Sequence, residues 1–380
     1  MTSERTYLDW NATAPLLPEA RAAIERALDV HGNPSSVHGE GRRARAIVET
    51  AREQVAALVG ARPSEVVFTS GATESCATVL TAPWQAILFA GIEHDAVRQP
   101  ADAATGECVA LHVSHDGRVD PADVTAKLRS VVASEATSRA LVALQLANNE
   151  TGVLQPVAEV ATATREAGSL VFTDAAQAAG RIPVDFAALG VDFMALSAHK
   201  FGGPKGIGAL IVRDGAELPA LIRGGGQERR RRGGTENIPG IAGFGAAAEA
   251  ARKTLGEHHR IAQLRDRLEA GLIELTPDAH IMGTGAPRLP NTTCVALQGL
   301  AAETLVIRFD LAGIAVSAGA ACSAGKIGAS HVLMAMGRDE ATARSAIRIS
   351  IGPATAARDI DRCLAAWRDI AADQRARTAA

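Results

Sequence analysis

Several titratable side chains follow apolar, strand-like segments of this sequence. His199 and Lys200 come soon after the segment 193–196, and Asp174 directly follows the segment 169–173. Burial at the end of a strand favours the neutral form of a lysine amine, and a neutral amine can form a Schiff base with an aldehyde. Most lysines instead extend to solvent, but only five of the 380 residues are lysines. A strand-end lysine near an aspartate is therefore a candidate catalytic group.

A glycine-containing turn, SGATE at 70–74, follows the apolar segment 66–69. The glycine permits a tight turn, and the backbone N–H groups of Ala72 and Thr73 would then open a helix whose N-terminus attracts anions. Such turns also begin helices that bind nothing. Together with Lys200 and Asp174, however, the turn indicates pyridoxal phosphate (PLP), because PLP needs a phosphate site, a Schiff-base lysine and a carboxylate at its pyridinium nitrogen.

The elements that carry these residues alternate between helix and strand. Short apolar runs occur at 66–69, 86–90, 141–146, 169–173 and 193–196, and helical segments or turns separate most of them. This pattern predicts a mostly parallel sheet with helices on both faces. Ligands of such sheets bind beyond the carboxyl ends of the strands. A further strand at 207–212 is reached through a glycine-rich turn, which permits an antiparallel direction.

The second part of the chain has a different pattern. An alanine-rich and charged stretch at 239–275, with Asn237 as its cap, predicts one long helix or two in series. A smaller α/β pattern follows, with predicted strands at 293–296 and 346–351, a helix at 302–311 and a last helix from about residue 356. We predict a large domain at 15–252 and a small domain at 253–380, which residues 1–14 join.

Composition excludes several classes of protein. The chain is 47% hydrophobic with a net charge of −3, which argues against disorder and against a nucleic-acid binder. The N-terminus lacks an apolar signal sequence, and no uncharged stretch predicts a membrane span. The five cysteines form no CxxC pair, so we expect no disulfide framework and no metal site, and most of them to be buried. These features predict a cytoplasmic protein.

The motifs of the chain resemble those of NifS/IscS-type cysteine desulfurases, which are PLP enzymes of fold type I in the aminotransferase class V family. The resemblance runs nearly end to end and rests on YLDWNATAP at 7–15, GNPSSVH at 32–38, FTSGATES at 68–75, EHDAV at 93–97, NNETGVLQP at 148–156, TDAAQAAG at 173–180, SAHKFGGPKGIGAL at 197–210, GGGQERRRRGGTEN at 224–237 and SAIRISIG at 345–352. It implies a large domain with a mostly parallel seven-stranded sheet flanked by helices, and a smaller C-terminal α/β domain.

The resemblance assigns the reacting groups. Lys200 would bind PLP as a Schiff base and later move the Cα proton of the substrate. Asp174 would pair with the pyridinium nitrogen, and His94 would stack on the ring and take part in catalysis. Cys322, in the glycine-rich segment SAGAACSAGKIG at 317–328, would attack the substrate sulfur as a thiolate. The products would be L-alanine and a Cys322 persulfide.

The same resemblance assigns the residues that hold cofactor and substrate. Gln177 would hydrogen-bond the ring hydroxyl, and Asn149 would contact the cofactor. Arg348, assisted by Asn149, would bind the substrate carboxylate through two parallel hydrogen bonds. The residues expected at the phosphate are Ala72, Thr73, Ser197, His199 and, from the other subunit of a homodimer, Thr235.

A sulfur-acceptor protein would then receive the persulfide, with an iron–sulfur scaffold as the first candidate. Two alternatives stay open at this point. A selenocysteine lyase or another PLP-dependent lyase would need Lys200 and Asp174 but not Cys322. A sulfur-relay partner would have little turnover of its own.

Overall fold

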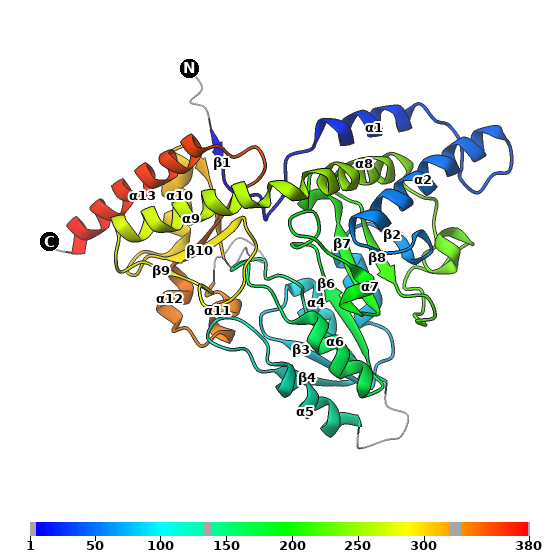
Figure 1. The fold of residues 1–380 in the computed structure, drawn as a ribbon, viewed down its shortest axis with the longest axis horizontal. Coiled ribbons are helices and arrows are strands. Elements are labelled where there is room, and N and C mark those ends of the chain that lie inside the picture. The colour runs from blue at the N-terminus through cyan, green and yellow to red at the C-terminus, as the bar shows by residue number, and fades with distance from the viewer. Residues whose placement is uncertain (1–4, 133–138, 320–327, 379–380) are drawn as a thin grey trace.

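A seven-stranded sheet forms the centre of the larger part of the molecule (Figure 1). The structure, a computed structural model, describes residues 5–132, 139–319 and 328–378. Across the sheet the strands are ordered β2 (Val66–Thr69), β8 (Gly208–Val212), β7 (Phe193–Ser197), β6 (Leu170–Asp174), β5 (Ala140–Ala143), β3 (Ala86–Ala90) and β4 (Glu107–Leu111). β8 is antiparallel to both neighbours, and the other pairs are parallel. The mostly parallel sheet and the antiparallel 207–212 strand are therefore confirmed.

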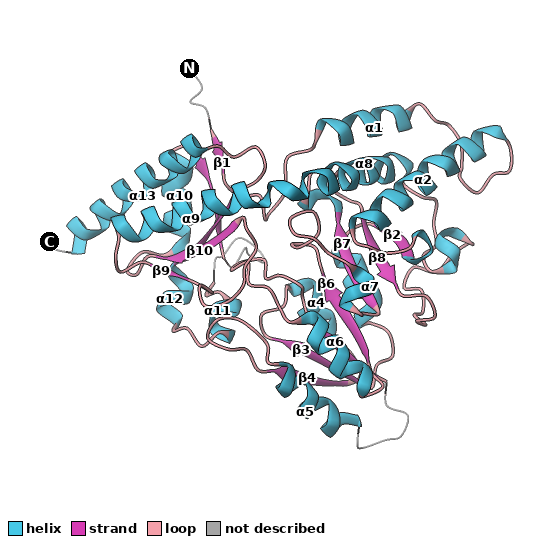
Figure 2. Cartoon of the chain, in the orientation of Figure 1, coloured by secondary structure: helices cyan, strands magenta, loops and turns pink. Residues whose placement is uncertain are grey.

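Helices cover both faces of this sheet (Figure 2). The helices of this part are α1 (Pro18–Leu28), α2 (Gly39–Leu58), α3 (Ala72–Leu80), α4 (Asp95–Asp102), α5 (Pro121–Val132), α6 (Val157–Glu166), α7 (Phe186–Leu189) and α8 (Ile238–Thr254). Successive side chains of a strand point to opposite faces. On β2, Phe68 packs into the core that includes Phe244 of α8, whereas Val67 packs into the core that includes Leu80 of α3. Burial on both faces explains why these strands are apolar throughout.

A smaller part of the molecule is built on two small sheets. One has the antiparallel order β12 (Ser317–Ala318), β13 (Ala346–Ser350), β10 (Thr292–Ala296) and β9 (His280–Ile281), and in the other β1 (Thr6–Tyr7) pairs with β11 (Ile314–Ala315). Its helices are α9 (His258–Leu275), α10 (Ala302–Leu311), α11 (His331–Ala335), α12 (Glu340–Ser345) and α13 (Ala357–Thr378). Leu8 packs into the core of this part together with Phe309 and Trp367. The domain boundary at residues 252 and 253 stays a prediction.

The long helical stretch consists of two helices in series. α8 ends at Thr254 and α9 begins at His258, with one 3-10 turn between them. Asn237 caps α8, as predicted, by accepting a hydrogen bond at Oδ1 from the Gly240 N–H at 3.2 Å. In Figure 1 the two helices run from the large sheet to the smaller part of the molecule. They therefore connect the two parts of the chain.

Two features of the fold differ from the sequence-based expectation. The 141–146 run forms a ladder strand only to Ala143, although the Leu146 N–H still bonds to the Asp174 carbonyl at 2.9 Å. β4 lies at the sheet edge, is mostly exposed and is not among the strands expected from the sequence. The helices also do not meet the requirements for a membrane span: within the described ranges, no helix is both long enough and apolar enough to cross a bilayer.

Candidate active site

A cavity of about 600 Å³ lies where β2, β6 and β7 end. Its size falls within the usual range for small-molecule sites. The predicted site residues that line it are Ala72, Thr73, His94, Asn149, Asp174, Gln177, Ser197, His199 and Lys200. The chain therefore brings together nine predicted residues that come from several separate segments. The position of the cavity follows the rule that ligands bind at the carboxyl ends of parallel strands.

One end of the cavity has the features of an anion site. Ala72 and Thr73 form the first turn of α3, so their backbone N–H groups have no carbonyl partner from an earlier turn. β8 approaches this turn very closely: a Cβ on Gly208 would lie 2.6 Å from the Gly71 Cα. Glycine at 208 therefore permits the sheet edge and the turn to meet. Ser197, the last residue of β7, lines the same cavity and is buried.

His199 is a neutral side chain at this end of the site. Burial lowers the pKa of His199 to about 4, and the positive charges of Lys200, Lys205 and Arg181 act in the same direction. Its Nδ1 lies 3.2 Å from the Thr13 hydroxyl. A neutral imidazole can still donate one hydrogen bond. His199 can therefore bind an anion as a hydrogen-bond donor rather than as a charge.

Asp174 ends β6 and faces the cavity. Its Oδ1 accepts a hydrogen bond from the Ala176 N–H at 2.9 Å. Burial raises the pKa of Asp174, whereas the hydrogen bond from the Ala176 N–H and the positive charge of a protonated Lys200 oppose that shift. A carboxylate in such surroundings is stabilised by a cationic partner placed in the cavity.

His94 is held by the backbone of the helix that it begins. It is the N-cap of α4, and its Nδ1 accepts a hydrogen bond from the Ala96 N–H at 3.0 Å. A ring nitrogen that accepts a hydrogen bond has no proton, so the neutral ring carries its proton on Nε2. The capping contact thus fixes both the ring orientation and the tautomer.

The Lys200 amine contacts the N-terminal segment of the chain. Its Nζ donates to the carbonyl oxygens of Asn11 at 2.7 Å and Ala12 at 3.1 Å. Burial lowers the pKa of Lys200 to about 7, and the positive charges of Arg181 and Arg348 add to this effect. A large fraction of the amine is therefore neutral at neutral pH, as the sequence predicted for a nucleophilic lysine.

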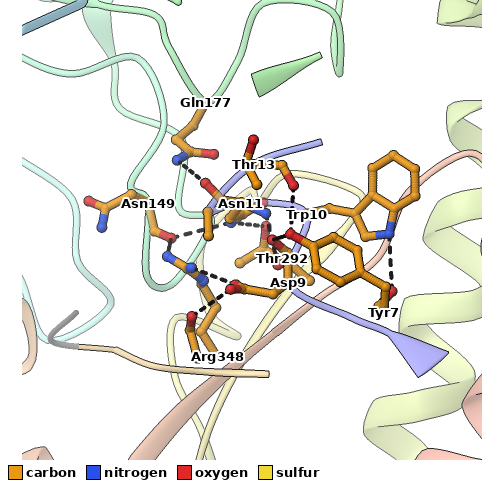
Figure 3. A network of polar contacts seen from close by, with 12 residues as sticks. Tyr7, Asp9, Trp10, Asn11, Thr13, Asn149, Gln177, Thr292 and Arg348 are labelled. Carbon is orange, nitrogen blue, oxygen red and sulfur yellow. Dashed lines mark hydrogen bonds and ion pairs between the residues drawn. The ribbon is translucent and has the colours of Figure 1, made fainter. Parts of the chain in front are cut away.

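Asn11 connects several predicted residues (Figure 3). Its carbonyl accepts a second hydrogen bond, from Gln177 Nε2 at 3.1 Å. Its side-chain Nδ2 donates to the Asn149 carbonyl at 3.2 Å and to the Thr292 hydroxyl at 2.9 Å. Sequence reasoning gave no role to Asn11: it lies in the motif YLDWNATAP at 7–15, but the sequence does not show which distant groups its amide and carbonyl contact.

Arg348 lies behind Asn149 and is almost fully buried, with 3% exposure. Its Nη1 donates to the Asn149 carbonyl at 3.0 Å, and its Nη2 pairs with Asp9 Oδ1 at 2.9 Å (Figure 3). Two buried atoms of the pair have no hydrogen-bond partner among the described residues: the Nε of Arg348 and the Oδ1 of Asn149. A buried donor and a buried acceptor left unpaired are costly unless a ligand satisfies them.

Three predicted residues are not among those that line this cavity: Thr235, Cys322 and Arg348, the last of which lies behind Asn149. Thr235 lines an adjoining cavity of about 240 Å³, and both cavities include Ser70 and Gly206. Cys322 lies outside the described residues. The strand before it, β12, is described, and Ser317 of β12 is the register partner of Arg348. The predicted cysteine segment therefore begins beside the predicted carboxylate site.

Three of the four described cysteines are buried, in agreement with the expectation for most of them. Cys76, Cys294 and Cys363 are buried and free, as predicted for packing residues, but Cys108 is exposed on the edge strand β4. Cys108 Sγ contacts the Ala101 carbonyl at 3.0 Å. Glu107 and Ala110 of β4 are exposed as well, so the exposure is shared by most of this strand.

Comparison with known proteins agrees with this geometry. Residues 6–363 match the aminotransferase class-V family. A cysteine desulfurase of Cereibacter sphaeroides is 44% identical over 95% of this chain and 94% of its own length. The solved structure of a NifS-like protein from Rickettsia africae is 35% identical, with a TM-score of 0.88 over 97% of this chain and 99% of its own. A structure of SspA in complex with cysteine is 30% identical, with a TM-score of 0.75 over 92% of this chain and all (100%) of its own.

The family match and the relatives cover almost the whole chain, including every described element that lines the cavity. The order of the seven strands and the site at their carboxyl ends provide the PLP fold type I architecture that the sequence predicted. The chain belongs to the aminotransferase class-V family, among the NifS/IscS-type cysteine desulfurases.

Proposed function

We propose that this protein uses PLP to remove sulfur from L-cysteine, giving L-alanine and a persulfide on Cys322. The observation that carries the proposal is the single cavity that contains Lys200, Asp174 and His94 next to the N-terminus of α3. The reaction needs no external oxidant: cysteine and the Cys322 thiol become alanine and a persulfide, because the Cβ–S bond breaks, an S–S bond forms and Cβ gains hydrogen.

The residues present fit PLP. The cavity has an anion site at α3 and a carboxylate, Asp174, whose raised pKa makes a cationic ring nitrogen a favourable partner. The unpaired Oδ1 of Asn149 offers a hydrogen-bond acceptor. In this proposal Thr73, Ser197, His199 and the backbone of Ala72 hold the phosphate. When bound, PLP supplies an electron sink for the electrons released at the substrate Cα.

Lys200 acts as the base at its Nζ. A pKa near 7 leaves much of the amine neutral at neutral pH and able to take the Cα proton. The Asn11 and Ala12 carbonyls hold this nitrogen at the cavity wall. His94 contributes its Nε2 proton, because Nδ1 is occupied by the Ala96 N–H. Gln177 orients the ring of the cofactor through the second N–H of its amide, since the first is bonded to Asn11.

Arg348 binds the substrate carboxylate in this proposal. Its Nε is buried without a partner, so a carboxylate would supply the missing acceptor. Asn149 stands between Arg348 and the cavity, and its side chain assists. The SspA structure contains cysteine in a related fold, which supports cysteine as the substrate here.

We also propose a homodimer in which Thr235 reaches the phosphate bound by the second copy. Thr235 lines the adjoining cavity together with Ser70 and Gly206, and these two residues also line the candidate active-site cavity of the same chain. The persulfide then passes to an acceptor protein, and an iron–sulfur scaffold is the first candidate, by the resemblance of the sequence. When the enzyme has formed its persulfide from sulfur-labelled cysteine and is then mixed with such a scaffold, the labelled outer sulfur of the persulfide should move to the scaffold.

The decisive experiment is to incubate the PLP-loaded protein with L-cysteine, measure the alanine formed, and determine the mass of the peptide that contains Cys322 by mass spectrometry. We expect alanine and a mass increase of one sulfur atom on that peptide. Cys322→Ser should keep the visible absorbance of the bound cofactor and lose alanine formation. Cys108→Ser, which changes an exposed cysteine remote from the cavity lining, is the matched control and should keep both. Normal alanine formation by Cys322→Ser would contradict the proposal.

A further inference from the structure

Arg181 is a buried arginine that sequence reasoning did not single out. Only 8% of the residue is exposed, and its two terminal nitrogens contact three separate segments. Nη1 donates to the Gln177 carbonyl at 3.2 Å and to the Gln177 side-chain Oε1. Nη2 donates to the carbonyls of Trp10 at 3.0 Å and Lys200 at 3.2 Å. All four acceptors are electrically neutral.

The charge of Arg181 is therefore not balanced by a contacting carboxylate in the described part of the chain. Burial and the like charge of Arg348 lower its pKa to about 9. Behind it lies a mostly apolar cavity of about 170 Å³, with Trp10, Leu17 and Phe201 in its wall. Such surroundings screen a charge poorly, and a buried charge without an ionic partner is costly. An uncharged side chain at position 181 would avoid this cost. The presence of a charged one therefore indicates that the charge has a role.

We propose that Arg181 is a positioning residue of the active site, which ties the Lys200 main chain to Trp10 and Gln177 and acts on the Lys200 amine through its charge. The proposal rests on the proposed role of Lys200 as the reacting amine. Arg181 itself does not line the cavity at the carboxyl ends of the strands, whereas Lys200 lines both that cavity and the one behind Arg181.

The electrostatic part of the proposal depends on which charges face Lys200. Arg181 and Arg348 lower the pKa of Lys200, while Asp174 and Asp9 raise it. Arg348 is paired with Asp9 at 2.9 Å, so the two fields largely cancel at a distance. After burial itself, Arg181 is the largest cause of the low pKa of Lys200. Its field is also independent of whether a substrate occupies Arg348.

The geometric part concerns the amide of Gln177. A guanidinium has only donors, so the Gln177 oxygen must face Arg181 and the nitrogen must face the opposite way. The nitrogen then donates to the Asn11 carbonyl, the same oxygen that accepts from Lys200 Nζ. Arg181 thereby sets which end of the Gln177 amide is presented towards the cavity.

The test measures the pKa of Lys200 directly, in the cofactor-free protein. Acetylation of lysines by dilute acetic anhydride across a pH series, read peptide by peptide by mass spectrometry, gives the pH at which Lys200 becomes reactive. We expect a midpoint near pH 7 in the wild type. Arg181→Gln keeps donors but removes the charge and should raise the midpoint by about 1 unit. Arg181→Lys keeps the charge and should shift it by less than about 0.3 unit.

The matched control is Arg165→Gln. Arg165 also donates to a main-chain carbonyl, that of Gly190 at 2.6 Å, but it is exposed on α6. It should leave the Lys200 midpoint unchanged. A second readout is the rate at which the apoprotein captures PLP: Arg181→Gln should slow it about fivefold at pH 7 and leave it nearly unchanged at pH 9.5, because the neutral fraction of the amine recovers.

An unchanged Lys200 midpoint in folded Arg181→Gln would overturn the proposal. If Arg181→Gln does not fold, a shift of about 1 unit in Arg181→Lys would overturn it, and so would a wild-type midpoint near the ordinary value for lysine. The labelling experiment requires neither cysteine nor turnover. A failure of this inference is therefore distinguishable from a failure of the proposed desulfurase reaction.

Discussion

Asp9 and the buried Arg348 form an ion pair between distant parts of the chain, with Asp9 Oδ1 2.9 Å from Arg348 Nη2 and with 17% and 4% of their side chains exposed. The other carboxylate oxygen, Oδ2, accepts from the Ser317 hydroxyl at 2.8 Å. Asp9 therefore links the predicted carboxylate-binding arginine to β12, the strand that precedes the cysteine segment. The arginine is oriented by the protein before any substrate arrives.

We predict that Asp9→Asn weakens cysteine binding more than it slows the reaction. Loss of a charged hydrogen bond loosens the Arg348 guanidinium, so KM for L-cysteine should rise about tenfold, while kcat changes by less than about threefold. Steady-state kinetics over a range of cysteine concentrations measures both. Asp310→Asn is the control, because Asp310 pairs with Arg5 at the exposed surface. A lower KM in Asp9→Asn would mean that Asp9 competes with the substrate instead of orienting Arg348.

The low pKa of Lys200 predicts a pH-dependent effect on stability. In the folded protein the pKa is about 7, below the ordinary 10.5, so between these pH values the unfolded chain binds more protons at this site. The contribution of Lys200 to stability therefore improves as the pH rises from 7 to 10. The free energy of unfolding of apo Lys200→Met, relative to that of the wild type, should be higher at pH 7 than at pH 9.5, by an amount on the order of a few kcal/mol. Urea unfolding at the two pH values measures the difference.

Lys253→Met is the control for that experiment, since Lys253 pairs with Glu249 on the exposed side of α8. It should show the same difference from wild type at both pH values. If the stability difference between Lys200→Met and wild type were also the same at both pH values, the pKa of Lys200 would not be lowered in the folded apoprotein.

Cys108 should be the first of the four described cysteines to react with iodoacetamide in the native protein. It is exposed, whereas burial protects Cys76, Cys294 and Cys363 and raises the pKa of each thiol. The pKa of Cys108 is also raised, by partial burial and by the charge of Asp102, so its labelling should accelerate between pH 8 and 10.

Peptide mapping after timed alkylation checks the order of labelling. Cys108→Ser should remove the first label among these four and provides a clean background for detecting chemistry at Cys322. Labelling of Cys294 before Cys108 would contradict the exposed position of β4.

The loop that leads to Thr235 contains three consecutive non-glycine residues in the left-handed region, with φ values of 45°, 55° and 66° at Glu228, Arg229 and Arg230. Glu228 is held there by a buried pair with Arg52, whose Nη1 lies 2.8 Å from its Oε2. Such a backbone costs a residue with a Cβ about 1 kcal/mol. Arg230→Gly should therefore raise the free energy of unfolding by about 0.5–1 kcal/mol.

Thermal unfolding of the variant measures this gain. Arg231→Gly is the matched control, because φ at Arg231 is −88°, so glycine there relieves no strain; it adds freedom to the unfolded chain and removes the hydrogen bond from Arg231 Nη1 to the Ser64 carbonyl. It should be less stable than wild type. Equal loss of stability in both variants would show that the 228–230 turn is not strained at Arg230.

Local patterns in the sequence determined much of the site. Asp174, Ser197, His199 and Lys200 could be placed at the strand ends because buried strands are continuous apolar runs and parallel strands present their carboxyl ends at one edge. The phosphate roles of Ser197 and His199 came only from the resemblance to a known family. The N-terminal turn of α3 was visible for the same reason: a glycine after an apolar run signals both the turn and the helix start. Such signals act over a few residues and need no knowledge of distant contacts.

Tertiary structure decided which distant residues act on those groups. Lys200 bonds to carbonyls 188 and 189 residues earlier in the chain, and Arg348 pairs with Asp9 across 339 residues. Asp9 belongs to the motif at 7–15 and Arg181 follows the motif at 173–180, but neither motif shows which distant groups these charges approach. Their charges matter because folding brings them into a poorly screened interior, where proximity rather than sequence spacing affects the pKa of the Lys200 amine.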